Sequence, residues 1–267
     1  MPSLDTLLAG LAKERATGAL RVGRAGAVYF DDGRITYMTC AQVPGAERLL
    51  AAHGRVSESA LRRVQADGGT ERLLEEGRVT LGELQYCVLG AVLDAAFFLL
   101  PVTGTRPKFR PGETHWLGGR WYFDVPGLVR ECARRRAQLA DAWPRADLDT
   151  SPVRVARRLP GQSVTLSDVQ WDVVVRADGE AVPLELAKRM GRSGYAVLLA
   201  VRRLAAAGLL VTAEDTPPLP KRVKRLDVTR AKAAAPAGGG PLGPVVTGDP
   251  TDIELLLRLR KALEELS

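Results

Sequence analysis

The stretch spanning residues 165–212 constrains the fold most, because its helix stops and starts recur at short intervals. Hydroxyl and proline residues favour the first turn of a helix, whereas glycine favours the position just after the last turn. The expected starts are Ser167, Pro183 and Ser193, and the expected stops are Gly179, Gly191 and Gly208. The apolar run at 209–212 then predicts a strand. The sequence therefore predicts three short helices followed by a strand.

Two short helices joined by a glycine turn, with a third helix leading into a strand, are typical of a winged helix-turn-helix. On the third helix, the side that carries Val197 and Val201 is predicted to pack on the first helix. The opposite side is the one that would read a major groove. Its candidate DNA contacts are Arg192, Ser193, Tyr195 and Arg202. Leu199 also lies there and is unusual against a base edge, so the same face suits protein docking about equally.

A basic cluster follows the expected strand. It consists of Lys221, Arg222, Lys224 and Arg225, in a chain whose formal net charge is +7. Lysine and arginine bind nucleic-acid phosphates without reading sequence, which makes these four residues candidate phosphate contacts. The alternative is a solvated, positively charged segment, which is the commoner meaning of a charge run.

The first 142 residues are expected to form an α+β domain. Alternating apolar residues over 18–40, interrupted by turns at 23–26 and 32–33, predict three antiparallel strands with Leu20, Val28 and Tyr37 on one side. Two further strands are expected around 107–110 and 116–122.

The sequence pattern around Gly54 recurs around Gly77, and in each copy one helix ends at the glycine and another begins soon after it. The repeat predicts two successive helical hairpins. Thr80 and Glu83 are spaced as a capping box for a helix that runs to about Leu100. A last helix is expected over 124–142.

No arrangement of residues indicates catalysis or metal binding. The chain has only two histidines, His53 and His115, and three cysteines without metal-ligand spacing. It also lacks nucleotide-binding, zinc-protease and serine-hydrolase motifs. We therefore expect a non-enzymatic protein without cofactor or metal. The most apolar stretch, 81–102, contains Glu83, Gln85 and Asp94, so it is predicted to be a buried core helix and the chain a cytoplasmic protein that does not enter membranes.

Residues 1–142 resemble PATAN-type domains, which are bacterial signalling modules. The resemblance rests on Thr17-Gly18-Ala19-Leu20, on Phe30-Asp31-Asp32-Gly33-Arg34-Ile35, and on the two glycine steps that follow. It implies a module that makes protein contacts and has no catalytic residues. Partners implied by the resemblance include Ras-like bacterial GTPases and their roadblock-type proteins.

The expected organisation has five parts. After the 1–142 domain come a bridge at 143–160, a winged helix with basic extension at 161–225, a flexible Pro, Ala and Gly-rich linker at 226–250, and an amphipathic helix at 251–267. A helix this short is marginal alone, so this last segment is expected to dock on its own chain, a twin chain or a partner. Its candidate contacts are Ile253, Leu256, Leu259 and Leu263.

Two functions fit the sequence. The first is a DNA-binding transcription regulator in which a protein-interaction domain controls a winged helix. The second is a signalling adaptor that joins partner proteins without binding DNA, through the N-terminal domain, Leu199 and the C-terminal helix. Either could be a homodimer.

Overall fold

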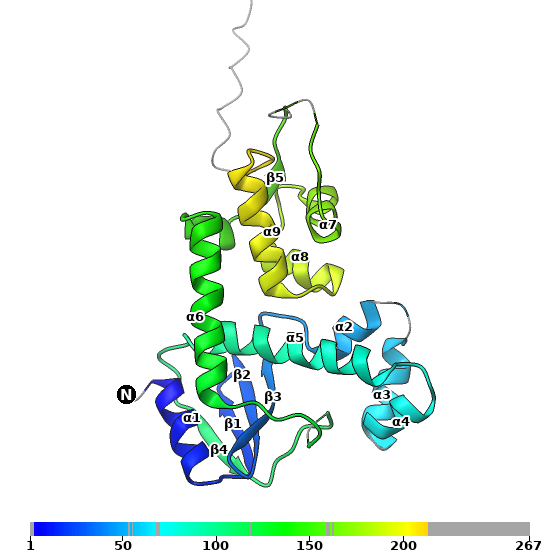
Figure 1. The fold of residues 1–267 in the computed structure, drawn as a ribbon, viewed down its shortest axis with the longest axis vertical. Coiled ribbons are helices and arrows are strands. Elements are labelled where there is room, and N and C mark those ends of the chain that lie inside the picture. Colours follow the sequence, from blue (N-terminus) through cyan, green and yellow to red (C-terminus); the bar gives the residue numbers. More distant parts are fainter. Residues whose placement is uncertain are drawn as a thin grey trace, which may run out of the picture. The chain divides into compact units, whose positions relative to one another are not determined.

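An antiparallel sheet of four strands forms the N-terminal part of the protein (Figure 1). The computed structural model describes residues 3–212, except residues 53, 55, 68, 69, 118, 159, 160 and 162. The strands are β1 (Gly18–Val22), β2 (Gly26–Asp31), β3 (Arg34–Cys40) and β4 (Lys108–Pro111), in the order β3-β2-β1-β4. The predicted three-stranded sheet is confirmed, and the strand predicted around 107–110 adds the fourth.

The strand register corrects one expected side-chain direction. Val28 pairs with Met38 and Tyr29 with Tyr37, and the register shifts between Tyr29 and Phe30. Paired residues share a face of the sheet while neighbours along a strand alternate. Tyr37 therefore lies on the face opposite to Val28, not beside it as predicted, because a bulge inserts an extra residue that a pattern of alternation cannot reveal.

The predicted turn at 32–33 is confirmed by backbone conformation. Asp32 and Gly33 both have positive φ, at 48° and 77°. Glycine adopts this region without strain, and aspartate tolerates it better than most residues. The Asp32 carboxylate also accepts two hydrogen bonds from Arg15, so the acidic pair at 31–32 belongs to a tight turn.

Six helices accompany the sheet: α1 (Leu4–Lys13), α2 (Ala46–Ala52), α3 (Glu58–Asp67), α4 (Thr70–Glu75), α5 (Leu81–Leu99) and α6 (Val125–Ala142). The two predicted glycine steps fall between α2 and α3 and between α4 and α5. Gly54 and Gly77 both have positive φ there. The capping box of Thr80 and Glu83 is present at the start of α5, and Asp124 caps α6.

The strand predicted around 116–122 is wrong. In that segment Leu117 is fully buried, and the Trp116 indole N–H donates to Glu47 Oε1 at 2.9 Å. A single bridge, Ile35 to Phe123, joins this region to β3. The aromatic residues of this segment suggested a strand, but Trp116 and Trp121 pack half-buried against the core and Tyr122 is exposed.

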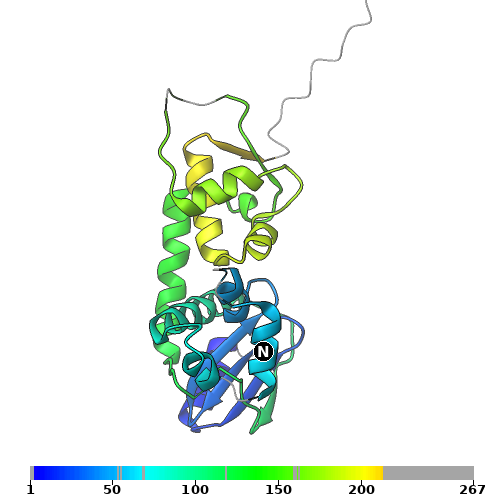
Figure 2. The ribbon, with the colours of Figure 1, turned by 90° about the vertical axis from the view of Figure 1, so that its right-hand side faces the viewer.

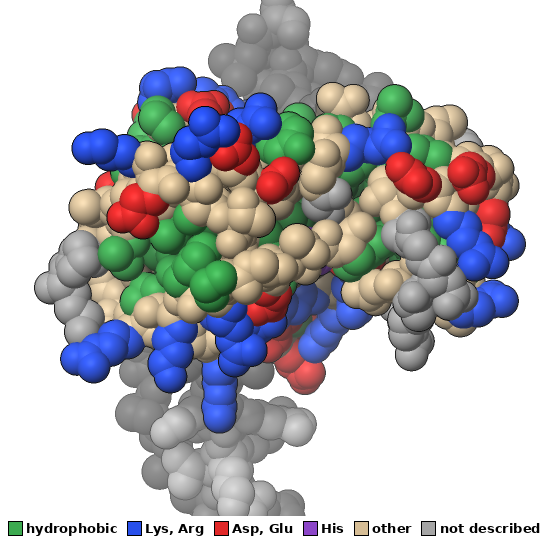
Figure 3. Space-filling view, turned by 90° about the horizontal axis from the view of Figure 1, so that it is seen from below, with side chains coloured by type: hydrophobic (Ala, Val, Ile, Leu, Met, Phe, Trp, Pro, Cys, Tyr) green, Lys and Arg blue, Asp and Glu red, His purple; other side chains and the backbone are tan. Residues whose placement is uncertain are grey.

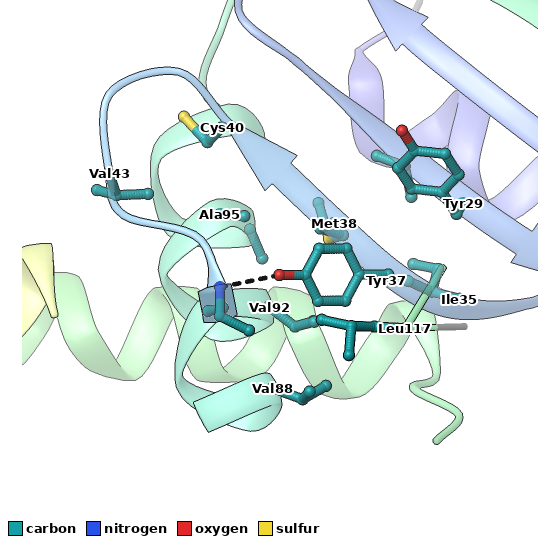
Figure 4. Close-up of a cluster of buried hydrophobic side chains, with 14 of the residues drawn as sticks. Tyr29, Ile35, Tyr37, Met38, Cys40, Val43, Val88, Val92, Ala95 and Leu117 are labelled. Atoms are coloured by element: carbon teal, nitrogen blue, oxygen red, sulfur yellow. Dashed lines mark hydrogen bonds between the residues drawn. The ribbon is translucent and has the colours of Figure 1, made fainter. Parts of the chain in front are cut away.

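The N-terminal core lies between the sheet and α5. Tyr37 sits inside it among Met38, Val88 and Val92, and its hydroxyl oxygen accepts a hydrogen bond from the Ala46 amide at 3.0 Å (Figure 4). This bond satisfies the phenol, which would otherwise be a costly buried polar group. By length and composition α5 could cross a membrane, yet half of that span is buried in the protein.

The later part of the chain contains three helices, as predicted. They are α7 (Asp168–Arg176), α8 (Pro183–Met190) and α9 (Gly194–Ala206). A short 3-10 helix, η1 (Ala146–Asp149), and a strand, β5 (Val153–Val155), precede them, and β6 (Leu210–Thr212) follows. Ser167 and Ser193 cap α7 and α9, and Gly191 ends α8 in the left-handed conformation.

The described residues of the segment expected as a bridge, 143–158, are part of this later unit. Strand β5 pairs antiparallel with β6, and Leu148 and Val153 enter a second core with Val173, Val197 and Val201. We call η1, β5, α7, α8, α9 and β6 together the three-helix module, and residues 3–142 the N-terminal module. The predicted packing of α9 on α7 is confirmed. Figure 2 shows α6, the last helix of the N-terminal module, extending beside the three-helix module.

Candidate functional site

Helix α9 is the element on which the two candidate functions depend, and it is buried on two sides. Val197 and Val201 face the second core, against α7 and α8. Tyr195 and Leu198 belong instead to the core of the N-terminal module, and Leu199 packs against that same core. On the face that would meet a major groove, Tyr195 and Arg202 are therefore buried against the same chain, whereas Leu199 is half-buried.

Two glycines bring the start of α9 very close to the N-terminal module. A Cβ atom on Gly194 would approach the Val43 side chain more closely than real carbon atoms do, and one on Gly191 would do the same to Ala52. The Arg48 guanidinium fixes the neighbouring end of α8, donating from Nε to the Lys188 carbonyl at 2.8 Å. The turn between α8 and α9 is thus packed on α2 and on the loop after β3.

Polar groups hold Tyr195 in this interface. Its hydroxyl donates to Gln138 Oε1 at 2.6 Å, and the guanidinium carbon of Arg135 lies 4.4 Å from its ring centre. Arg135 in turn donates from Nη1 to Asp94 Oδ1 at 2.8 Å, and Asp94 is almost fully buried. Burial raises the pKa of Asp94, although the nearby Arg135 acts in the opposite direction. The network links α5, α6 and α9.

Arg202, predicted to face outward, is also buried. It binds the Asp149 carboxylate through Nε at 2.9 Å and Nη2 at 2.6 Å. Its Nη1 donates to the carbonyl oxygens of Leu139 and Trp143, at 2.9 and 2.8 Å. These carbonyls lie at the C-terminal end of α6, which carries partial negative charge, and the Leu139 oxygen also accepts from the Trp143 amide at 3.1 Å. Arg202 therefore caps α6 instead of facing solvent.

The remaining candidates on the three-helix module have internal partners as well. Arg192 donates to Asp172 Oδ2 at 2.8 Å and pairs with Asp168 at 3.2 Å, which ties the start of α9 to α7. The Ser193 hydroxyl accepts from the Ala196 amide at 3.2 Å. The other candidates lie outside the described residues: Lys221, Arg222, Lys224, Arg225, Ile253, Leu256, Leu259 and Leu263.

The titratable groups do not gather into a reactive site. Burial lowers the pKa of His115 to about 4, and its ring stacks on Tyr37 with centroids 3.9 Å apart. All three cysteines are buried as free thiols, and burial raises the pKa of each. Among the described residues, no three His, Cys, Asp or Glu side chains are placed to share a metal ion.

Two cavities meet beside α9. One, of about 320 Å³, lies between α5, α7 and the start of α9. The other, of about 270 Å³, lies between α7 and α9 and shares the lining residues Val169, Tyr195 and Ala196 with the first. We call the two together the α5–α9 groove.

A separate cavity of about 480 Å³ lies between α1 and the loop before β4. It is lined mainly by apolar residues such as Leu4, Leu7 and Val22, with Arg106 among them. Figure 3 views the end of the molecule that carries the sheet, where hydrophobic side chains gather and Lys and Arg side chains stand around them. Its described lining contains no buried polar side chain that could select a particular ligand.

Sequence reasoning missed the residues that fix α9 in place. Asp94 was noted only as a charge that argues against a membrane span, and Gly194 was not singled out. A carboxylate inside an otherwise apolar helix was the one available signal, because such a group needs a cationic partner from another element.

Comparison of the chain with protein-family models, with curated proteins and with solved structures found no match.

Proposed function

We propose that this chain is a non-enzymatic regulatory adaptor that works through protein contacts. The burial of the outward face of α9 against α5 and α6 carries the proposal, because a helix in that position cannot enter a major groove. The resemblance of residues 1–142 to PATAN-type domains supports the same function. A Ras-like GTPase or a roadblock-type protein remains a proposed partner on that resemblance alone.

The contacts of α9 suit a permanent interface better than a switch. Gly191 and Gly194 leave no room for a side chain between α9 and the N-terminal module, and Arg202 donates to the Leu139 carbonyl of α6. Separation of the modules would take the Tyr195 hydroxyl from Gln138 and the Arg202 guanidinium from the Leu139 carbonyl, and it would expose Leu198 to water.

The second candidate is a DNA-binding transcription regulator with a winged helix. It is favoured by the order α7, α8, α9, β6, by the serine cap of α9, and by the basic residues Lys221–Arg225 that follow in sequence. Under this alternative the basic residues would hold phosphates, and α9 would have to leave α5 and α6 before it could read bases.

Binding of the purified full chain to fragmented genomic DNA across a salt series tests the proposal. We expect no fragment to be selected near physiological salt, and any binding at low salt to weaken steeply as salt rises. Replacing Lys221, Arg222, Lys224 and Arg225 with Ala should flatten that dependence. Tight, sequence-selective binding at physiological salt would refute the adaptor and favour the regulator.

A further inference from the structure

One side of α5 is apolar and uncovered. The helix buries its other side in the core, yet Tyr86 is 74% exposed and Leu89 is 43% exposed. Gly82 and Gln85 lie on the same exposed stripe, one turn or two from these residues. Gly82 has no atom of another residue near the position of a Cβ, so a neighbouring chain can approach the helix backbone there.

This stripe leads into the α5–α9 groove. Tyr86, Leu89 and Leu93 form one wall of the first cavity, and Val169 of α7 faces them. The second cavity continues past Val169 to Leu199 and Arg203 on α9. The two cavities therefore adjoin at Val169, Tyr195 and Ala196, and helices α5, α7 and α9 bound them.

The charges on the groove have one sign. Its lining residues include Arg135, Arg192 and Arg203 and no Asp or Glu. Carboxylates outside the lining offset two of these charges: Arg135 pairs with Asp94 and Glu131, and Arg192 pairs with Asp168 and Asp172. Arg203 is exposed, and its guanidinium makes no ion pair or hydrogen bond within the described part of the chain. Negative charge on an incoming partner would be attracted here.

We propose that the α5–α9 groove binds a single helix of a partner protein, with apolar residues on one side and carboxylates beside them. The proposal rests on the adaptor function and names the chemistry of its partner. The groove walls are helices, whose backbone groups are already paired, so they offer no edge to which an extended strand could add. A helix satisfies its own backbone and can place apolar side chains at three- and four-residue intervals along the groove.

Selection from a displayed library of helical peptides against the intact chain tests the proposal. We expect enriched peptides to carry apolar residues at helical spacing together with Asp or Glu. Leu89→Asp should weaken their binding at least about tenfold, as loss of an interface anchor does. Tyr86→Ser should also weaken it, and since that side chain is mostly exposed, folding is preserved. Arg203→Glu should weaken acidic peptides selectively.

The matched control is Val175→Asp, because Val175 is 58% exposed on α7 but does not line the groove. Peptides that bind Leu89→Asp as well as the original chain, or that show no acidic preference, would overturn the proposal. Evidence that the groove holds a different occupant would also overturn the proposal. Self-association abolished by Leu89→Asp would identify a second copy, and peptide binding seen only after deletion of residues 251–267 would identify that segment.

These outcomes are independent of the test of function. Sequence-selective DNA binding would refute the adaptor whatever peptides are selected. If the selected peptides bind the groove variants as well as the original chain, the adaptor function would still stand, but the groove would not be its binding site.

Discussion

His115 is the residue whose protonation most directly couples to folding. It is buried against Tyr37, and its pKa is lowered from 6.5 to about 4. The unfolded chain therefore binds the proton at a higher pH than the folded chain does. The contribution of neutral His115 to the free energy of unfolding is therefore present above pH 6.5 and is lost as the pH falls toward 4.

The expected loss over that window is at most about 3 kcal/mol, from roughly 1.4 kcal/mol for each unit of pKa. Urea unfolding at a series of pH values measures it. His115→Phe keeps a ring against Tyr37 but cannot be protonated, so its stability should change less between pH 6.5 and 4. Equal slopes for the two proteins would show that His115 does not titrate as its burial implies.

At the scale of elements, the approach of α9 to the N-terminal module depends on Gly194. Alanine there favours a helix by up to about 1 kcal/mol, yet its methyl group would collide with Val43. We expect Gly194→Ala to destabilise the chain by about 1 to 3 kcal/mol, the usual cost of overpacking.

The matched substitution is Gly82→Ala on α5, where a methyl group meets nothing. It should be neutral or stabilising by up to about 1 kcal/mol. Both are measured by the midpoint of urea unfolding. If Gly194→Ala stabilises the chain as much as Gly82→Ala does, α9 is not held against Val43 in solution.

Helix boundaries were predicted correctly where residues within one helical turn determine them. The ends of α5, α7, α8 and α9 follow from Thr80, Ser167, Gly191 and Ser193, which act within one helical turn. The segment 116–122 was mispredicted because its aromatic residues are compatible with a strand or with burial from a loop. The choice was made by a distant residue, Glu47, which accepts the Trp116 indole hydrogen bond.

For the whole molecule, the two modules are expected to unfold together. Tyr195 and Leu198 of α9 complete the core of the N-terminal module, and residues 1–218 form one compact unit. A chain ending at residue 142 would lose both side chains, each of which contributes about 1.5 to 3 kcal/mol through burial.

Unfolding in urea, followed by circular dichroism and by tryptophan fluorescence, checks this expectation. The full chain should show coincident transitions by both signals. The chain ending at 142 should be less stable by at least about 3 kcal/mol. Separate transitions in the full chain, or a shortened chain of equal stability, would mean that the modules fold independently.

The sequence by itself determined where helices begin and end, the hairpin turn at 32–33, and the α+β class, because these depend on residues within a few positions of one another. Tertiary structure alone decided that the outward face of α9 is covered by its own chain. An apolar or mixed helix face has the same sequence pattern whether α6, a partner or DNA lies against it. The placement of Gln138 against Tyr195 and of the Leu139 carbonyl against Arg202 distinguishes these cases.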